Sequence, residues 1–363
     1  MTPDDFDVRS THESRRDNGT GEPALTDGAG VNRGVADDRE AMVFVSWAPF
    51  CSRSDSMALR LGGKSFMVYS PHYGSRYLTV PFKYLSQTIK TLRILFRERP
   101  ATVFVMTPPV FACLPAWIYA RLTGASFVID AHTAAFLDAR WKRLLFVHKW
   151  FSRAARTTIV TNEHMQGIVR NWHASATLVR DVPICFAKPA FPELDGACNM
   201  TFVSTFTRDE PIELFFEAAA QVPEVRFHVT GNYRRADVHV LAKKPDNVRL
   251  TGFLPDPDYV GLLLSSDAVI CLTTMDHTMQ RGAYEAVYLG RPVITSNFDL
   301  LRRHFCKGSV HVDNTVEDIV SGVQRMRNNL ARFRAEIEEL RRQRIEDWNR
   351  VEVALRQMTG ASS

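Results

Sequence analysis

A carboxylate and an imidazole stand two residues apart where an apolar segment of the chain ends. The segment is predicted to be a strand, and Asp130 and His132 follow its last apolar residue, Ile129. In an open α/β sheet, ligands bind at the carboxyl ends of the strands. At such a place Asp130 can act as a base or an orienting group, and His132 can donate to a substrate hydroxyl or phosphate. The alternative is that Asp130 caps the next turn and His132 is an ordinary surface residue.

A second candidate is the segment Val203–Pro211, where a predicted strand leads through a short polar loop into a helix. Free N–H groups at a helix N-terminus bind phosphate, and Arg208 can add a positive charge there. The alternative is an ordinary capped helix with Asp209 as its N-cap. The segment therefore predicts either an anion site or a helix start without a ligand.

The most specific candidate is the segment His277–Thr295. Its helix opens around Gln280 and ends at Gly290, where glycine favours the position after a helix. Arg281 and the loop N–H groups can hold a diphosphate at this helix N-terminus. Glu285 lies one to two turns into the helix and can accept hydrogen bonds from both hydroxyls of a ribose. The apolar residues around Glu285 favour a position lining a cleft over a solvated surface.

The elements that must position these residues alternate between strand and helix over most of the chain. Apolar strands in this rhythm are typical of a parallel sheet covered on both faces. Three prolines within residues 183–192 interrupt the rhythm and predict a linker. Two Rossmann-like halves in series give a two-lobed α/β body with a cleft between the lobes. The expected division is a disordered polar arm at 1–40, a first domain at 41–184, a second domain at 185–335, and a helix and tail at 336–363.

Three local predictions concern the first domain. Residues 51–56 are expected to form a polar loop, and residues near 139–155 a single helix. Residues 100–120 carry no charge and have the length of a transmembrane helix. Pro108–Pro109 would remove hydrogen bonds at the middle of such a helix, and residues 102–106 are β-prone. A strand, a turn and a buried helix therefore explain this segment better than a membrane span.

Charge is distributed unevenly, although the net charge is only +5. Residues 41–184 hold 18 basic and 6 acidic residues, a net charge of +12, whereas residues 185–363 hold 22 basic and 24 acidic ones. The first domain is therefore expected to meet something anionic, such as a membrane surface, a nucleic acid or an acidic substrate. The six cysteines form no C-x-x-C pair, which argues against a zinc module and for reduced thiols in a cytosolic protein. The acidic start of the chain has no apolar run behind it and is not predicted to be a signal peptide.

Two predicted helices of the first domain combine basic residues with Trp and Phe residues. They are Phe82–Arg99 and Ala139–Arg156. Basic amphipathic helices of this kind suit an anionic membrane surface. The alternative is that the apolar face packs on the sheet and the basic face is merely solvated. The residues expected at a membrane or acceptor surface are Lys142, Arg143, Lys149, Trp150 and Arg153.

The second half of the chain resembles the nucleotide-sugar lobe of GT-B glycosyltransferases, and is closest to their family 4-like group. The resemblance rests on the loop and helix followed by Gly290–Ser296, together with Asn247–Phe253 and Ser266–Ala268. Residues 101–133 resemble the strand, helix and D-x-H strand end of the first lobe. The resemblance implies two Rossmann-like lobes facing across a cleft, with a C-terminal helix that crosses back onto the first lobe.

The resemblance also implies roles for individual residues. Glu285 matches the second glutamate of the E-x7-E motif, which binds the donor ribose, while His277 stands at the first position, which contacts the donor sugar. His132 matches a histidine that faces the donor sugar, and Phe253 falls where the backbone meets the nucleobase. The expected donor-binding residues are Thr205, Arg208, Phe253, His277, Gln280, Arg281, Gly282 and Glu285.

The chain departs from the family at two basic positions, which fall at Thr205 and Glu210. Arg208 and Arg281 are the available substitutes for neutralising a departing diphosphate. Related inverting enzymes use a carboxylate base from the first lobe, for which Asp130 is the candidate. Inversion and retention both stay open.

Together these patterns predict a glycosyltransferase that moves a sugar from a nucleotide diphosphate donor to a lipid-linked or cell-envelope glycan acceptor. We expect catalysis without a metal or a cofactor, since the nucleotide sugar is a substrate and no clustered Asp motif for Mg²⁺ appears. The protein is expected in the cytoplasm, on the inner face of the cell membrane, with no nucleic acid partner. The alternatives are a catalytically degenerate GT-B scaffold that binds a partner and a nucleotide-sugar epimerase of the same fold.

Overall fold

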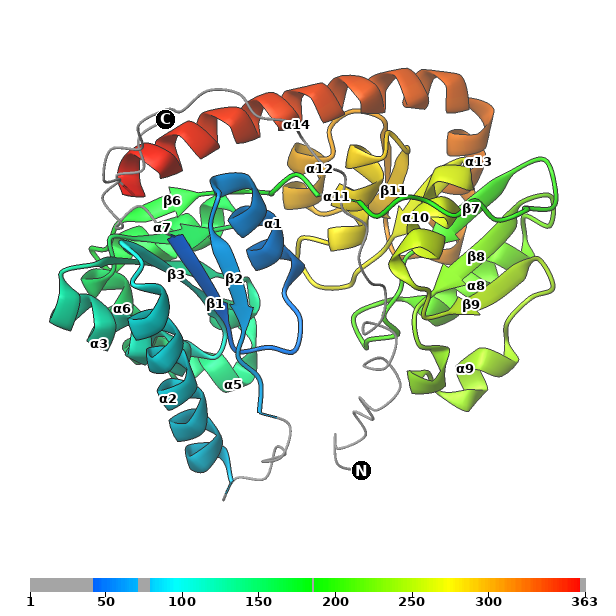
Figure 1. The fold of residues 1–363 in the computed structure, drawn as a ribbon. Helices are drawn as coiled ribbons and strands as arrows, with labels where there is room; N and C mark the ends of the chain where they lie inside the picture. Colours follow the sequence, from blue (N-terminus) through cyan, green and yellow to red (C-terminus); the bar gives the residue numbers. More distant parts are fainter. Residues whose placement is uncertain (1–41, 71–78, 185, 360–363) are drawn as a thin grey trace, which may run out of the picture.

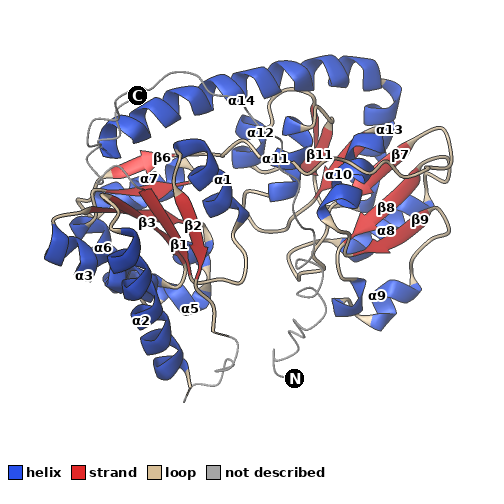
Figure 2. Ribbon diagram, in the orientation of Figure 1, coloured by secondary structure: helices blue, strands red, loops and turns tan. Residues whose placement is uncertain are grey.

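The structure is a computed structural model, and it describes residues 42–70, 79–184 and 186–359. Within these ranges the strands form two six-stranded sheets, one in each lobe, and all paired strands are parallel. Figure 2 shows helices packed around both sheets. The predicted α/β fold of two Rossmann-like lobes is thereby confirmed. The arm predicted at 1–40 lies outside the described residues.

The first lobe is built around a sheet whose strands alternate with helices along the chain. Its elements are β1 (Met42–Ser46), α1 (Ser52–Leu61), β2 (Lys64–Met67), α2 (Val80–Glu98), β3 (Thr102–Thr107), η2 (Val110–Ala112), α3 (Cys113–Thr123), β4 (Ser126–Ala131), α4 (Ala134–Leu137), α5 (Ala139–Lys142), α6 (Leu145–Ala154), β5 (Thr157–Val160), α7 (Glu163–Asn171) and β6 (Ala176–Leu178). The strand order is β2-β1-β3-β4-β5-β6. Side chains alternate along a strand, so Val43 and Val45 pack toward α2 and α3, while Met42 and Phe44 pack toward α1.

The second lobe repeats this plan after the linker. Its elements are β7 (Asn199–Phe202), α8 (Ile212–Ala220), β8 (Arg226–Thr230), η3 (Tyr233–Arg235), α9 (Val238–Ala242), β9 (Val248–Gly252), α10 (Asp256–Ser265), β10 (Ala268–Cys271), α11 (Arg281–Tyr288), β11 (Val293–Ser296), α12 (Asp299–His304), β12 (Ser309–Val312) and α13 (Val316–Asn328). The strand order is β12-β11-β10-β7-β8-β9. The order of the strands therefore reverses between β7 and β10, and ligands of open α/β sheets bind at such a point.

The last described helix, α14 (Leu330–Thr359), joins the two lobes. Ile337 and Leu340 pack into a core cluster of the second lobe, whereas Trp348 and Leu355 pack into a core cluster of the first lobe. Figure 1 shows α14 running along one side of both lobes. The predicted helix that crosses back onto the first lobe is confirmed.

Three local predictions are wrong. Residues 51–56 are not a loop, because α1 begins at Ser52: the Asp55 N–H donates to the Cys51 carbonyl (3.1 Å), and the Asp55 carboxylate stabilises the first turn. Residues 139–155 do not form one helix. The Leu144 N–H donates to the Trp141 carbonyl (2.8 Å), and this tighter turn separates α5 from α6. The charged residues from about 316 to 357 predict one long helix, but it is likewise divided at Asn329 into α13 and α14.

The uncharged segment 100–120 is divided between β3, η2 and α3, as the prolines and the β-prone residues predict. Among the described residues, the structure contains no helix that is both long and apolar enough to cross a membrane.

Candidate active site

The carboxyl ends of the two sheets face each other. His164, at the start of α7, stacks on His277, which follows β10, with ring centroids 4.3 Å apart. The Tyr284 hydroxyl of α11 donates to the Arg180 carbonyl (3.3 Å). Residues that follow strand ends in different lobes are thus in contact, and a substrate bound here would be within reach of both lobes.

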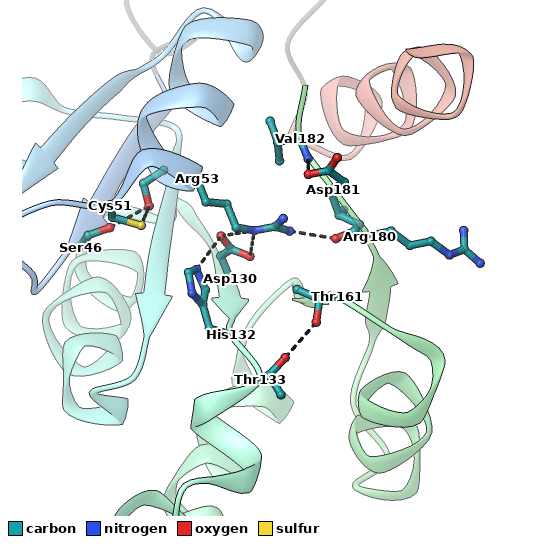
Figure 3. Close-up of polar contacts among 12 residues, drawn as sticks. Ser46, Cys51, Arg53, Asp130, His132, Thr133, Thr161, Arg180, Asp181 and Val182 are labelled. Carbon is teal, nitrogen blue, oxygen red and sulfur yellow. Dashed lines mark hydrogen bonds and ion pairs between the residues drawn. The ribbon is translucent and has the colours of Figure 1, made fainter. Parts of the chain in front are cut away.

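Asp130 lies at the end of β4 and is only 3% exposed (Figure 3). Its two carboxylate oxygens accept from Arg53 Nε at 3.2 and 3.1 Å. Burial alone would lower the pKa of Arg53, but the carboxylates of Asp130 and Asp181 outweigh it and raise that pKa. A carboxylate that is buried and already paired with a guanidinium is poorly placed to receive a proton from a substrate.

His132 directly follows β4, two residues after Asp130, and its side chain is 35% exposed. Its Nε2 is 3.9 Å from Asp130 Oδ2 and has no hydrogen-bond partner within the described part of the chain. Burial by itself would raise the pKa of the neighbouring Cys51, but the interaction with His132 outweighs it and lowers that pKa. Of the two sequence-predicted catalytic residues, His132 is therefore the more exposed, although its Nε2 atom is itself buried and faces Asp130.

In the second lobe, Glu210 fills a group of backbone donors after β7. Its carboxylate accepts from the N–H groups of Thr205 (3.0 Å) and Phe206 (2.8 Å) and from the Ser204 hydroxyl (2.6 Å). Phe206 has a φ of 55°, which turns these donors toward one point. Convergent N–H groups of this kind bind anions. The chain therefore supplies its own anion at this position, beside the exposed Thr205 and Arg208.

The Asp209 side chain is not the N-cap of α8. That helix begins at Ile212, and Asp209 Oδ2 instead accepts from the Thr273 hydroxyl (3.2 Å). The Thr274 N–H also donates to the Asp209 carbonyl (2.7 Å). Asp209 thus joins the loops that follow β7 and β10, at the reversal of the strand order.

Glu285 lies in α11 and is 6% exposed. Its Oε1 accepts from Arg281 Nε (2.6 Å) and its Oε2 from the Tyr259 hydroxyl (2.5 Å). Burial and the Glu285 carboxylate raise the pKa of Tyr259, which keeps this hydroxyl protonated as a donor. Each carboxylate oxygen retains one further acceptor site, so ribose hydroxyls would have to share Glu285 with these two partners.

The remaining predicted donor-site residues differ in their surroundings. Gln280 Nε2 donates to the Leu272 carbonyl (2.7 Å). Gly282 allows α11 to lie close to the sheet, because a Cβ there would meet Val203 at 2.7 Å. Phe253 is 78% exposed. His277 has a φ of 59° and contacts His164, which places it at the junction of the lobes.

The residues predicted at a membrane surface lie on and before α6. Lys142, Arg143 and Arg153 are exposed, and Lys149 is half-buried. Trp150 is 51% exposed and packs edge-to-face on Trp117 of α3, with centroids 5.1 Å apart. Together with neighbouring helices they form what we term the α2–α6 face. Its exposed apolar residues are Phe82, Leu85, Ile89 and Phe96 of α2, Leu122 of α3, and Phe146 and Trp150 of α6.

Two residues of this site were missed by the sequence analysis. Arg53 was assigned to a polar loop, and Tyr259 to the first turn of a helix expected at 257–264. A basic residue in the first turn after the first strand was the available signal for Arg53, since that turn lies at the carboxyl edge of the sheet. Tyr259 gave no signal, because its contact with Glu285 spans 26 positions of the chain.

Comparison with solved structures shows that this arrangement is the GT-B fold. Sucrose-phosphate synthase from Thermosynechococcus elongatus superposes with a TM-score of 0.67 at 16% identity, over 89% of this chain and 100% of that one. The Anabaena protein HepE in complex with UDP and glucose gives 0.65 at 12% identity, over 88% and 100%. A Listeria monocytogenes structure described as a UDP-N-acetylglucosamine 2-epimerase gives 0.55 at 10% identity, over 90% and 98%.

Within that fold, residues 197–329 match the family model of glycosyl transferases group 1. The resemblance to GT-B glycosyltransferases found in the sequence is therefore confirmed. The chitobiosyldiphosphodolichol beta-mannosyltransferase of Pongo abelii is 27% identical over 143 residues, which is 35% of this chain and 31% of that protein. The human protein of the same name is 26% identical over 148 residues, with the same shares. The chain thus matches about a third of the length of these curated relatives.

Proposed function

We propose that the protein is a glycosyltransferase that uses a nucleotide diphosphate sugar as donor. The observation that carries the proposal is the match of residues 197–329 to glycosyl transferases group 1, on a lobe whose α11 holds the buried Glu285. Transfer needs a group that takes the proton of the acceptor hydroxyl and positive charge near the departing diphosphate. The first lobe supplies the former and the second lobe the latter.

In the proposed reaction, His132 receives the proton of the acceptor hydroxyl as that oxygen attacks the sugar carbon. Asp130 serves this step by stabilising the imidazolium that forms, since its Oδ2 lies 3.9 Å from Nε2. The bond from the sugar carbon to the diphosphate breaks, and the nucleoside diphosphate leaves with the electron pair. Arg281 and Arg208 are proposed to neutralise it.

The reaction is proposed to need no cofactor or metal. Within residues 42–70, 79–184 and 186–359, the His, Cys, Asp and Glu side chains include no group of three placed to hold a metal ion. Arginines and convergent backbone N–H groups can stabilise a diphosphate by themselves. The nucleotide sugar therefore enters as a substrate rather than as a bound cofactor.

A lipid-linked or cell-envelope acceptor is proposed for the first lobe. The curated relatives carry a dolichol diphosphate acceptor in their names. The α2–α6 face exposes large apolar residues in a domain with a net charge of +12. Exposed apolar side chains on a basic domain favour an anionic membrane, which would place the protein on its cytoplasmic side. A nucleotide-sugar epimerase shares the fold, but it would convert a soluble substrate and need no such face.

The proposal is tested by thermal unfolding with a panel of nucleoside diphosphates and nucleotide sugars. One base is expected to stabilise the wild type by about 2.7 kcal/mol at 100 times its dissociation constant. Glu285→Ala should abolish the shift, while the exposed Glu213→Ala should keep it. If no nucleotide shifts the wild type, the transferase proposal fails and a degenerate GT-B scaffold takes its place. An equal shift in Glu285→Ala would place the nucleotide away from α11.

A further inference from the structure

Arg53 connects the Asp130–His132 pair to the segment that leads into the second lobe. While its Nε contacts Asp130, its Nη2 donates to the Val179 carbonyl (2.9 Å), one residue beyond β6. The guanidinium side chain is only 14% exposed. Figure 3 shows it extended between the end of β4 and the strand-to-linker segment. One side chain thus joins three parts of the molecule: α1, the end of β4 and the segment that follows β6.

Two carboxylates of the first lobe face Arg53. Asp130 faces it from β4, and Asp181 faces it from the segment after β6. Tyr288 of α11 contacts Asp181, and Arg344 of α14 lies close to it. Through Asp181, the surroundings of Arg53 are therefore linked to the second lobe and to the crossing helix.

We propose that Arg53 is a positioning residue for transfer: it fixes Asp130 in the orientation that serves His132 and ties that orientation to the junction of the lobes. The inference rests on the proposed function. A buried carboxylate next to one imidazole can rotate about its side-chain bonds unless another group holds it. The fork of Nε and Nη2 restrains it, because the same planar group is anchored at Val179.

Arg60 offers a matched comparison on the same helix. Its Nε donates to the Pro183 carbonyl (2.7 Å), so it also joins α1 to the linker. The two carboxylate contacts of Arg53 have no equivalent among the hydrogen bonds and ion pairs described for Arg60. Replacing Arg60 therefore removes only a hydrogen bond from α1 to the linker. Replacing Arg53 removes a comparable hydrogen bond and, in addition, the contacts that orient Asp130.

The test compares Arg53→Met, Arg53→Lys and Arg60→Met in steady-state transfer, using the donor identified in the nucleotide panel. Arg53→Met should lower kcat about 100-fold with KM changed less than threefold, because a misplaced catalytic group costs rate and not substrate binding. Arg53→Lys should restore part of kcat, since it keeps the charge without the fork. Arg60→Met should stay within threefold of the wild type.

The pH–rate profile separates positioning from a merely structural role. Removing a neighbouring positive charge favours the protonated form of the proton acceptor, so the acid limb of the Arg53→Met profile should move to higher pH. Arg60→Met should keep the wild-type limb. If Arg53→Met does not fold, as judged by circular dichroism, Arg53→Lys and Arg60→Lys carry the same comparison.

Equal losses in the Arg53 and Arg60 variants, or an Arg53→Met variant with wild-type kcat and profile, would overturn the positioning role alone. A wild type without turnover on any nucleotide sugar would overturn the proposed function, and this inference with it.

Discussion

Of the carboxylates at the two facing sheet edges, Asp130 and Glu285 are buried and Glu210 is half-buried. All three are paired, yet they leave different groups exposed to a substrate. Asp130 in the first lobe is held by Arg53 and stands behind His132, whose side chain is 35% exposed. In the second lobe, backbone N–H groups already bind the Glu210 carboxylate, and Arg281 and Tyr259 already bind the Glu285 carboxylate. In the proposed reaction the first lobe offers the proton acceptor, whereas the second lobe shares its polar groups with the donor.

The difference has a simple origin in charge. At Glu210 the chain carries a carboxylate where the family resemblance implies a lysine, and a carboxylate satisfies the nearby N–H groups without a ligand. The proposed diphosphate contacts are then left to Arg281 and Arg208, of which Arg281 is also the partner of Glu285. The comparison therefore predicts large losses from changes in the first lobe and a gain of nucleotide affinity from one change in the second.

The largest effect is expected for His132→Asn. Removing a general base costs about 10³-fold in kcat, and nucleotide binding by the other lobe should be unchanged. The control is His173→Asn, an exposed position with a φ of 56° that asparagine tolerates. Transfer rates and the nucleotide thermal shift are measured for both variants. A His132→Asn variant that retains wild-type kcat would show that the first lobe does not supply the proton acceptor.

The second largest effect is expected for the stability of the protein when Asp181, near the junction of the lobes, is replaced. Burial raises its pKa from 3.8 to about 6, and the contacts with Tyr288 and Arg53 offset only part of that. Between these two values the native state binds more protons than the unfolded state, so this group makes stability fall as pH rises. Asp181→Asn should therefore raise the free energy of unfolding at pH 7.5 by up to about 3 kcal/mol, and leave it unchanged at pH 3.5.

Urea unfolding at the two pH values tests this prediction. An Asp181→Asn effect of the same size at both would mean that the carboxylate does not titrate differently in the native state.

The next effect concerns membrane binding, which we expect to depend on the α2–α6 face of the first lobe. Phe82→Ser combined with Leu85→Ser should weaken partition to vesicles with 30% phosphatidylglycerol by about 2.5 kcal/mol, or some 70-fold, if both side chains insert. Leu59→Ser is the control, since Leu59 is 66% exposed on α1, on the opposite side of the same sheet. Sedimentation with vesicles measures both. Equal losses in the two variants, or equal wild-type binding to uncharged vesicles, would contradict a specific anionic surface.

The smallest effect is expected for Glu210→Gln. Removing a negative charge near the proposed diphosphate site should tighten nucleoside diphosphate binding about tenfold, or about 1.4 kcal/mol. The amide accepts from fewer N–H groups, so a loss of about 1 kcal/mol in stability should accompany the gain. Glu213→Gln, an exposed residue of α8 paired with Lys243, should change neither quantity. Unchanged or weaker nucleotide binding in Glu210→Gln would mean that Glu210 does not compete with the donor.

The sequence by itself determined the class of the fold. Continuously apolar strands, helices between them and a proline-rich linker predicted two parallel-sheet lobes, because these patterns reflect local geometry and the burial of each sheet on both faces. The candidate residues Asp130, His132 and Glu285 were likewise placed at strand ends or on the expected helix. Prediction failed where a local preference was weak, as at the start of α1 and the break between α5 and α6.

Only the tertiary structure decided what each of these side chains faces. Arg53 and Asp130 are 77 positions apart, and Tyr259 and Glu285 are 26 apart. Their contacts depend on how helices pack on the sheets, which no local pattern encodes. The carboxylate of Glu210 reaches its donors only because Phe206 adopts a positive φ. Which polar groups remain open to a substrate is therefore a property of the packed lobes, while the order of strands and helices is a property of the chain.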